Sequence, residues 1–163
     1  VIMEKKQVVT TLKKVMKRFG FVPRASVVYK HHDDLIISLR VGTFIPAGGQ
    51  YVVIEITPAE WLPEPAFPRL DVVGLHERAE TLDELQSVEV FRRLALDYES
   101  QLPPQELEEA FEALAEWIDR TIKSRRGVAQ AILQGGAWWS WNSTIRMKDW
   151  ASKVCSTSED GDM

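Results

Sequence analysis

Hydrophobic positions at the start of the chain repeat with the period of a helix. Val8, Leu12 and Val15 fall on one stripe, and lysines and an arginine fill most of the other positions. Gly20 follows the stripe directly and is typical of a helix end, because glycine adopts the left-handed conformation without strain. The pattern predicts an amphipathic helix over residues 4–19.

The next part of the chain alternates hydrophobic and polar positions with the period of two that is typical of strands. The alternation predicts three strands, over residues 26–31, 35–41 and 50–57. The turn His32-Asp33-Asp34 and the loop Pro46–Gly49 that separate them are short, which favours an antiparallel meander. Residues 70–73 resemble a short fourth strand. One face of this sheet needs an apolar cover, and the first helix offers a matching stripe.

Helical periodicity returns in the second half of the chain. Thr81 and Glu84 form a capping-box pattern, which predicts that a helix starts there and runs to about Tyr98. Two consecutive prolines at positions 103 and 104 are typical of a first helical turn. They predict a long helix that bends at Gly127 and ends at Gly135. A last helix, capped by a polar residue at position 142 or 143, is expected to follow.

These elements predict an α+β fold, in which an N-terminal helix lies on a three- to four-stranded antiparallel sheet and a helical C-terminal half follows. An all-helical protein with a β-hairpin insert is the alternative. We predict a single domain over residues 1–154, since the proline-rich stretch 58–68 is too short for a typical linker. Residues 155–163 are polar and acidic, and we predict that they form a flexible tail.

Composition narrows the class of protein. The chain has 163 residues, of which 45% are hydrophobic and 27% are charged. This length and balance suit a folded domain with its own core, and they exclude a disordered or fibrous chain. No apolar run approaches the roughly 20 residues of a membrane span. Cys155 is the single cysteine and has no partner for an internal disulfide, which favours a reducing, cytoplasmic location.

The net charge of −4 hides blocks of opposite sign. Residues 1–40 and 120–154 each carry +6, whereas residues 77–119 carry −10. Such blocks produce local potentials that the net charge conceals. Either the basic and acidic helices pack beside each other and partly cancel, or an acidic surface is left for a basic partner.

Several motifs of the first 75 residues resemble the bacterial domain-of-unknown-function family 4304. They are the helix with Leu12 that ends in Gly20-Phe21, the strand Val27-Val28-Tyr29, and the segment Gly48-Gly49-Gln50-Tyr51 that opens another strand. The resemblance implies a small α+β domain and brings no catalytic residues. By analogy with small domains found beside polymorphic toxins, it implies an immunity or antitoxin role.

Catalytic and metal-binding patterns are weak. His31 and His32 are adjacent on a predicted strand and therefore point to opposite faces, which argues against a shared metal ion. Cys155 has no histidine or acidic residue assigned nearby, and the chain has neither a Gly-x-Ser-x-Gly elbow nor a phosphate-binding loop. We therefore expect no catalytic residues, no metal and no cofactor.

We predict a non-enzymatic protein that binds another protein, such as an immunity-type inhibitor that occludes the active site of a toxin. The predicted partner-binding residues are Glu108, Glu109, Glu112, Glu116, Trp138 and Trp139, because acidic patches and exposed tryptophans are typical of docking surfaces.

Two other functions stay open. A small-molecule binder or enzyme is the alternative, with a pocket between sheet and helices and with Arg40, Tyr51 and Glu55 on one polar face. The tryptophans near three arginines (Arg125, Arg126 and Arg146) suit nucleic acid, but the acidic block argues against it.

Overall fold

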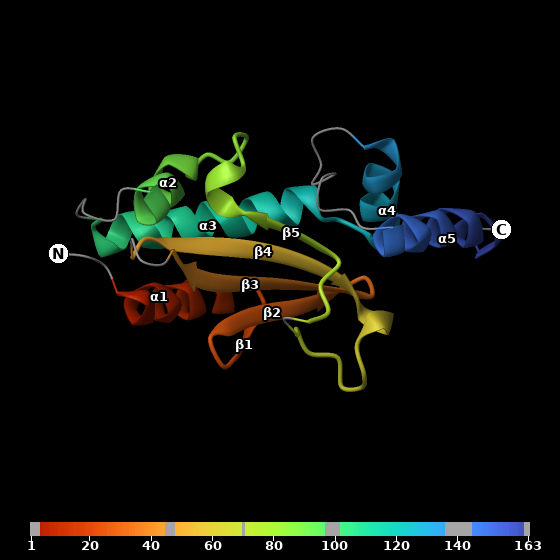
Figure 1. The fold of residues 1–163 in the computed structure, drawn as a ribbon, viewed down its shortest axis with the longest axis horizontal. Coiled ribbons are helices and arrows are strands. Elements are labelled where there is room, and N and C mark those ends of the chain that lie inside the picture. Colours follow the sequence, from red (N-terminus) through yellow and green to blue (C-terminus); the bar gives the residue numbers. More distant parts are fainter. Residues whose placement is uncertain (1–3, 45–47, 70, 97–101, 136–144, 162–163) are drawn as a thin grey trace.

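The computed structural model describes residues 4–44, 48–69, 71–96, 102–135 and 145–161 and shows an α+β fold (Figure 1). Strands of the described part form one antiparallel sheet in the order β1-β2-β3-β4-β5, so each strand pairs with its neighbour in the chain. The strands are β1 (Val22–Arg24), β2 (Val27–His32), β3 (Leu35–Thr43), β4 (Gln50–Pro58) and β5 (Leu75–Arg78). The predicted fold class is confirmed, with a sheet somewhat wider than expected.

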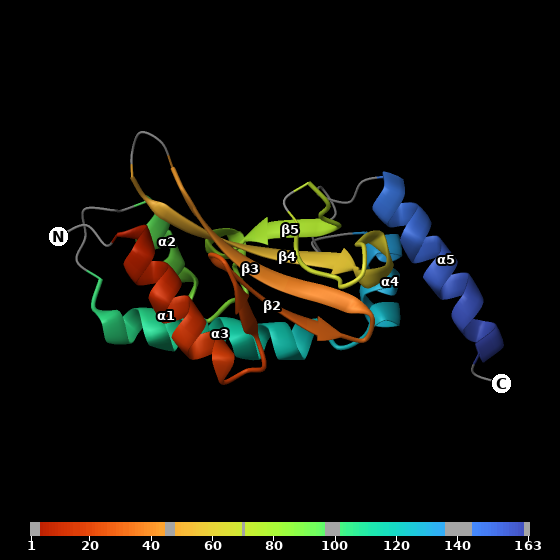
Figure 2. The ribbon, with the colours of Figure 1, turned by 90° about the horizontal axis from the view of Figure 1, so that it is seen from below.

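One helix precedes these strands in the sequence, and the other helices of the described part follow them. They are α1 (Lys5–Lys17), α2 (Val88–Leu96), α3 (Pro104–Thr121), α4 (Arg125–Gln134) and α5 (Ile145–Gly161), with the short 3-10 helices η1 (Ala59–Trp61) and η2 (Ala79–Thr81). In Figure 2, α1 and α3 lie along one side of the sheet, and α4 and α5 lie beyond its end.

Helix α1 confirms the first prediction. Its stripe is fully buried, and its end is fixed by the residues that follow. Gly20 adopts a φ of 87°, and the N–H of Phe21 donates to the carbonyl of Met16. The ring of Phe21 is then buried against the core, so the chain turns sharply from helix to sheet.

The predicted strands 26–31, 35–41 and 50–57 are confirmed as β2, β3 and β4, whereas both edge strands differ from the prediction. Strand β1 was not predicted, because it is short and contains a proline, which only an edge strand tolerates. The predicted strand 70–73 is wrong: Arg69 and Val72 form only an isolated bridge, and the fifth strand begins at Leu75.

The two faces of the sheet are covered differently. Apolar side chains such as Leu39 and Ile54 pack against the helices and form the main core. On the other face, Tyr29 and Ile36 pack under the loop 59–72 and form a second, smaller cluster. The remainder of that second face carries polar and charged side chains such as Arg40 and Glu55.

Two helix boundaries of the second half differ from the predictions. The Thr81 hydroxyl lies within hydrogen-bond distance of two acceptors, the Glu77 carboxylate and the carbonyl of Arg78, so it acts as a donor and does not accept a bond as a helix cap does. Helix α2 therefore starts later, at Val88. The long predicted helix is broken into α3 and α4, because Ser124 caps a new helix by accepting a bond from the N–H of Gly127.

Helices α4 and α5 pack closely on each other at the C-terminal end of the molecule. Val128 and Ile132 from α4 and Trp150 and Val154 from α5 are buried in this contact region. Helix α5 continues to Gly161, past its predicted end and into the segment predicted as a flexible tail. The predicted cap of this helix, at position 142 or 143, lies outside the described residues.

Candidate functional site

An acidic groove lies between α2 and α3. Its volume is about 320 Å³, and its walls include Ser87 and Val90 from the α2 side and Ala113 from α3. Four glutamates of α3 line it: Glu106, Glu109, Glu112 and Glu116. Three of the four partner-binding glutamates predicted from the sequence therefore face one groove, and we refer to it below as the acidic groove.

Basic residues of α1 neutralise part of the acidic helix. Lys14 Nζ lies 2.7 Å from Glu108 Oε1, and Arg18 Nη2 lies 2.9 Å from Glu112 Oε1. The bond from Lys14 lowers the pKa of the Glu108 carboxyl. The prediction that basic and acidic helices pack beside each other and partly cancel is confirmed for these pairs. Glu108 therefore faces α1 and does not line the groove.

The remaining glutamates differ in their partners. Glu106 pairs with Arg93 of α2 at 3.0 Å. Among the described residues, no cation pairs with Glu109 or Glu116, and Glu109 accepts a hydrogen bond from the Gln105 amide. These two are one heptad apart on α3 and exposed, so their charges are available at the mouth of the groove. The predicted residues Trp138 and Trp139 lie outside the described part of the chain.

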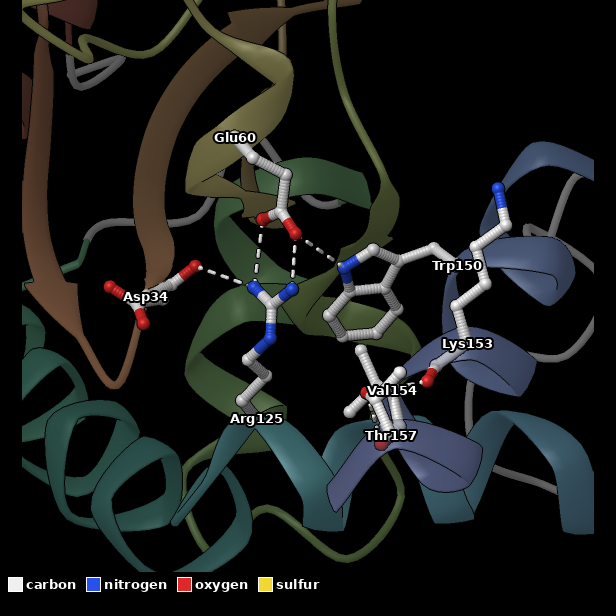
Figure 3. A network of polar contacts seen from close by, with 7 residues as sticks. All are labelled: Asp34, Glu60, Arg125, Trp150, Lys153, Val154 and Thr157. Atoms are coloured by element: carbon white, nitrogen blue, oxygen red, sulfur yellow. Dashed lines mark hydrogen bonds and ion pairs between the residues drawn. The ribbon is translucent and has the colours of Figure 1, made fainter. Parts of the chain in front are cut away.

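A second polar arrangement joins α4 and α5 to the sheet (Figure 3). The two terminal guanidinium nitrogens of Arg125 both donate to the Glu60 carboxylate, and Nη1 lies 2.7 Å from Oε1. The Trp150 indole N–H donates to Glu60 Oε2 at 3.3 Å. The carbonyl of Asp34 accepts a further bond from Arg125, and the Asp33 carboxylate accepts one from the Arg125 backbone N–H. The Glu60 carboxylate thus sits in a cradle of three donors.

The cradle shifts the titration of both charged partners. Hydrogen bonding from Arg125 lowers the pKa of Glu60, and the same contact raises the pKa of Arg125. A hollow of about 470 Å³ opens beside the pair, with Trp150, Lys153 and Thr157 of α5 on its wall. The pair is partly exposed, with 24% of the Arg125 side chain accessible.

Sequence reasoning missed this cradle. Glu60 and Arg125 lie 65 positions apart, and Glu60 and Trp150 lie 90 apart. The sequence signal that was available is the predicted turn at Asp33-Asp34. In the structure both residues of this turn adopt positive φ values, of 50° and 58°. The turn was predicted correctly, but its contact with α4 depends on the tertiary fold.

A third polar cluster contains Arg40, Tyr51 and Glu55, the residues that the sequence suggested for a small-molecule pocket. Arg40 Nε lies 3.2 Å from Glu55 Oε1, and the Ser38 hydroxyl donates to the same oxygen at 3.1 Å. Tyr51 lies on the same face of β4 as Glu55, as strand alternation predicts. This face is opposite to the one that packs on α1 and α3, since Leu39 and Ile54 point to the helices. The three residues therefore do not line a pocket between sheet and helices.

The histidine pair takes up two separate contacts. His31 Nε2 lies 3.0 Å from the carbonyl of Ala66, and His32 Nε2 lies 2.6 Å from the carbonyl of Lys123. The two rings point to opposite sides, as the strand pattern predicts. Within the described ranges, no three histidine, cysteine or acidic side chains are grouped as a metal site requires.

Comparison of the chain with protein-family models, with curated proteins and with solved structures found no match. The resemblance to family 4304 therefore stays a prediction. In the part of the chain that the structure describes, no helix combines the length and the hydrophobicity that a membrane span needs.

Proposed function

We propose that this chain is a non-enzymatic binding protein whose acidic groove accepts a basic segment of a protein partner. The observation that carries the proposal is the pair Glu109 and Glu116, which line the groove without a cationic partner among the described residues. Other acids on the same helix are already neutralised by Lys14, Arg18 and Arg93. Unpaired like charges in a groove favour a partner of opposite charge and speed its association.

The more specific proposal is a cytoplasmic immunity-type inhibitor that neutralises a bacterial toxin by covering its active site. The resemblance of the first 75 residues to family 4304 supports this role by analogy. A groove rimmed by carboxylates suits the occlusion of a basic active-site cleft, since such an interface needs complementary charge and no catalytic group on the inhibitor.

Binding to a basic peptide tests whether the acidic groove accepts a basic segment. We expect a fluorescein-labelled helical peptide with lysine at every fourth position to bind the full chain at 50 mM NaCl, measured by anisotropy. The double variant Glu109→Gln/Glu116→Gln should weaken binding about tenfold, because two charge contacts are lost. Glu64→Gln removes a single negative charge from the loop over the other sheet face and serves as the control for a loss of charge outside the groove. Absence of binding, or equal weakening by the control, would contradict the proposal.

Growth assays test the inhibitor role. Each protein encoded beside this chain is expressed in a bacterial host, and the one that arrests growth is co-expressed with the chain. We expect growth to be restored by the wild-type chain and by Glu64→Lys, but not by Glu109→Lys/Glu116→Lys. If no neighbouring product arrests growth, or if the charge-reversed variant also restores it, the inhibitor role is wrong.

The hollow beside Trp150 supports a second candidate, a small anionic ligand. Its wall combines the indole ring of Trp150 with the cations Arg125, Arg126 and Lys153 and with two carboxylates, of which Glu60 is paired with Arg125. Its volume of about 470 Å³ is in the range of ligand pockets. A thermal-shift screen with nucleotides and dicarboxylates is the test. A stabilising ligand whose effect is lost in Lys153→Gln favours this function, and a screen without a stabilising compound contradicts it.

A further inference from the structure

Three arginines from three strands lie in one row across the sheet. The pairing register joins Arg24 to Val27, Val27 to Arg40, Arg40 to Val53, and Val53 to Arg78. Residues paired across antiparallel strands project to the same face, and here that face is opposite to α1 and α3. Successive arginines are two strands apart, which is about 10 Å. We call Arg24, Arg40 and Arg78 the arginine row.

Each guanidinium of the arginine row is held by a neighbouring side chain. The guanidinium of Arg24 lies 3.7 Å from the centre of the Phe67 ring. The guanidinium of Arg78 lies 5.2 Å from the Phe44 ring centre and 5.7 Å from that of Tyr51. Held planar groups lose little freedom when a ligand binds, so the row is preorganised.

Aromatic rings accompany the row on the same face. Phe44 and Tyr51 pack against each other with ring centres 4.7 Å apart, and both are partly exposed. The Tyr51 ring lies directly over Gly42, where a Cβ atom would come within 2.2 Å of it. A glycine at this position therefore lets the ring lie close to the sheet. Partly exposed rings beside guanidinium groups form the kind of platform on which unpaired bases stack.

The glutamates of α3, which belong to the acidic block that argued against nucleic acid, do not face this surface. The acidic groove lies between α2 and α3, and α3 packs on the opposite face of the sheet. The carboxylates that pair with the row, Glu55 and Glu80, are themselves buried, with side-chain exposures of 6% and 5%. Arg78, in contrast, is 42% exposed. At this end of the row, solvent therefore meets the guanidinium of Arg78 more than the carboxylate of Glu80 that pairs with it.

We propose that this sheet face binds single-stranded nucleic acid. The three guanidinium groups of the arginine row contact phosphates, and the rings of Phe44 and Tyr51 stack on bases. An acidic peptide would match the charges but would leave the rings without a role, so nucleic acid is the partner that uses both features. The proposal is independent of the acidic groove, which lies on another side of the molecule.

Anisotropy with labelled 15-nucleotide strands of oligo-dT and oligo-U tests the proposal on the full chain. With three phosphate contacts, we expect the logarithm of affinity to fall with the logarithm of salt with a slope of about −2. Arg24→Gln should reduce the size of this slope by about 0.7, and Tyr51→Ala should weaken binding about fivefold or more. The DNA and RNA strands show which backbone is preferred.

Arg78 needs a variant that keeps the fold intact. Its removal would leave Glu80 as a buried charge without its counter-ion, so Arg78→Gln is made in a Glu80→Gln background and compared with Glu80→Gln alone. We expect the added change at Arg78 to weaken binding and to lower the salt slope again. Thermal unfolding of each variant verifies that it is folded at the assay temperature.

Two controls make the test decisive. Lys6 and Lys17 on α1 are exposed and have no ion pair among the described residues, so Lys6→Gln/Lys17→Gln removes charge from a different basic surface. We expect this variant to bind like the wild type. Loss of binding in this variant, no binding of either strand at 50 mM NaCl, equal binding of duplex DNA, or equal binding of a labelled polyglutamate peptide would each overturn the proposal.

Discussion

The Glu80 carboxylate is the least satisfied polar group of the described core. Both oxygens are buried without a hydrogen-bond partner, and the guanidinium of Arg78 forms an ion pair with Oε1 at a distance of 3.2 Å from Nε. Burial raises the pKa of Glu80 from its ordinary value of 4.5, and the nearby Glu77 carboxylate adds to this effect. The native state therefore holds a proton at this site more tightly than the unfolded state does.

The sign of the pH dependence follows from this shift. Below pH 4.5 Glu80 is protonated in both states and does not affect the free energy of unfolding. As the pH rises from 4.5 through the higher native pKa, the unfolded state loses its proton first, so stability falls. We expect Glu80→Gln to remove this fall and to raise the free energy of unfolding at pH 7 by about 1 kcal/mol.

Urea unfolding of wild type and Glu80→Gln between pH 4 and 8 measures this difference. Glu84→Gln, which changes an exposed carboxylate close by in the sequence, is the control and should leave both stability and its pH dependence unchanged. A Glu80→Gln variant that is less stable than wild type at pH 7 would show that the charge of Glu80 is needed for its contact with Arg78.

Some residue positions were predictable from the sequence and others were not. The stripe with Val8 and Leu12 and the glycine at position 20 follow from local periodicity and backbone preference, and both are where the sequence placed them. The ion pair of Glu108 was not predictable, because it depends on α1 packing beside α3. The acid-rich pattern alone does not distinguish a neutralised carboxylate from one that faces a groove.

At the scale of elements, a turn approaches a helix closely at Gly49. A Cβ atom at this position would lie 2.0 Å from the backbone carbonyl oxygen of Ala95 in α2. The sequence indicated a flexible hairpin turn here, whereas the structure shows that the absence of a side chain lets α2 pack against the start of β4. Backbone cannot move aside as a flexible side chain does, so a larger residue must displace the helix.

We therefore expect Gly49→Ala to lower the free energy of unfolding by about 2–3 kcal/mol, as overpacking does. Gly20→Ala is the comparison: a Cβ added there would meet no atom beyond its chain neighbours within 4 Å, so only the left-handed backbone, with φ of 87°, opposes the change, at about 1 kcal/mol. Urea unfolding of both variants gives the two values. A Gly49→Ala variant as stable as Gly20→Ala would mean that α2 is not tightly fixed against β4.

Boundaries of elements were predicted less well than their existence. The strands β2, β3 and β4 have strict alternation, whereas β1 and β5 are short edge strands with little pattern of their own. The Thr-x-x-Glu pattern at Thr81 was misleading, because the hydroxyl found an acceptor in the buried Glu77 carboxylate. A polar side chain near a helix start bonds to the partner that the tertiary fold brings close to it. A local sequence pattern does not show which partner that is.

At the scale of the whole molecule, positive and negative charges are separated between opposite faces of the fold, and this separation does not follow the charge blocks of the sequence. The basic N-terminal block is divided between α1, where Lys14 and Arg18 neutralise α3, and the sheet, where Arg24 and Arg40 lie on the opposite face. One face of the fold therefore offers unpaired carboxylates and the other offers guanidinium groups. The two proposed surfaces can be changed separately, because the sheet and its core lie between them.

The C-terminal helix pair is the part of the molecule that we expect to open first in acid. Helices α4 and α5 pack mainly on each other, and Glu60 ties them to the sheet through Arg125 and Trp150. The pKa of Glu60 is lowered, chiefly by its bond from Arg125, so the native state favours the charged carboxylate. Its contribution to stability is present above the unfolded-state value of 4.5 and is lost as the pH falls through the lower native pKa.

Cys155 on α5 reports this opening, because it is the single thiol and is partly buried against the core. We expect its reaction with 4,4′-dithiodipyridine, a reagent that works in acid, to accelerate as the pH falls below 4.5, while circular dichroism still shows a folded sheet. Glu60→Gln lacks the charged contact at every pH, so its thiol should react faster than that of wild type at pH 6 and should show little further increase in acid. Glu64→Gln, a neighbouring change outside the cradle, should behave as wild type. Equal rates in wild type and Glu60→Gln at pH 6 would mean that apolar packing between α5 and the core, and not the Glu60 cradle, holds the helix pair in place.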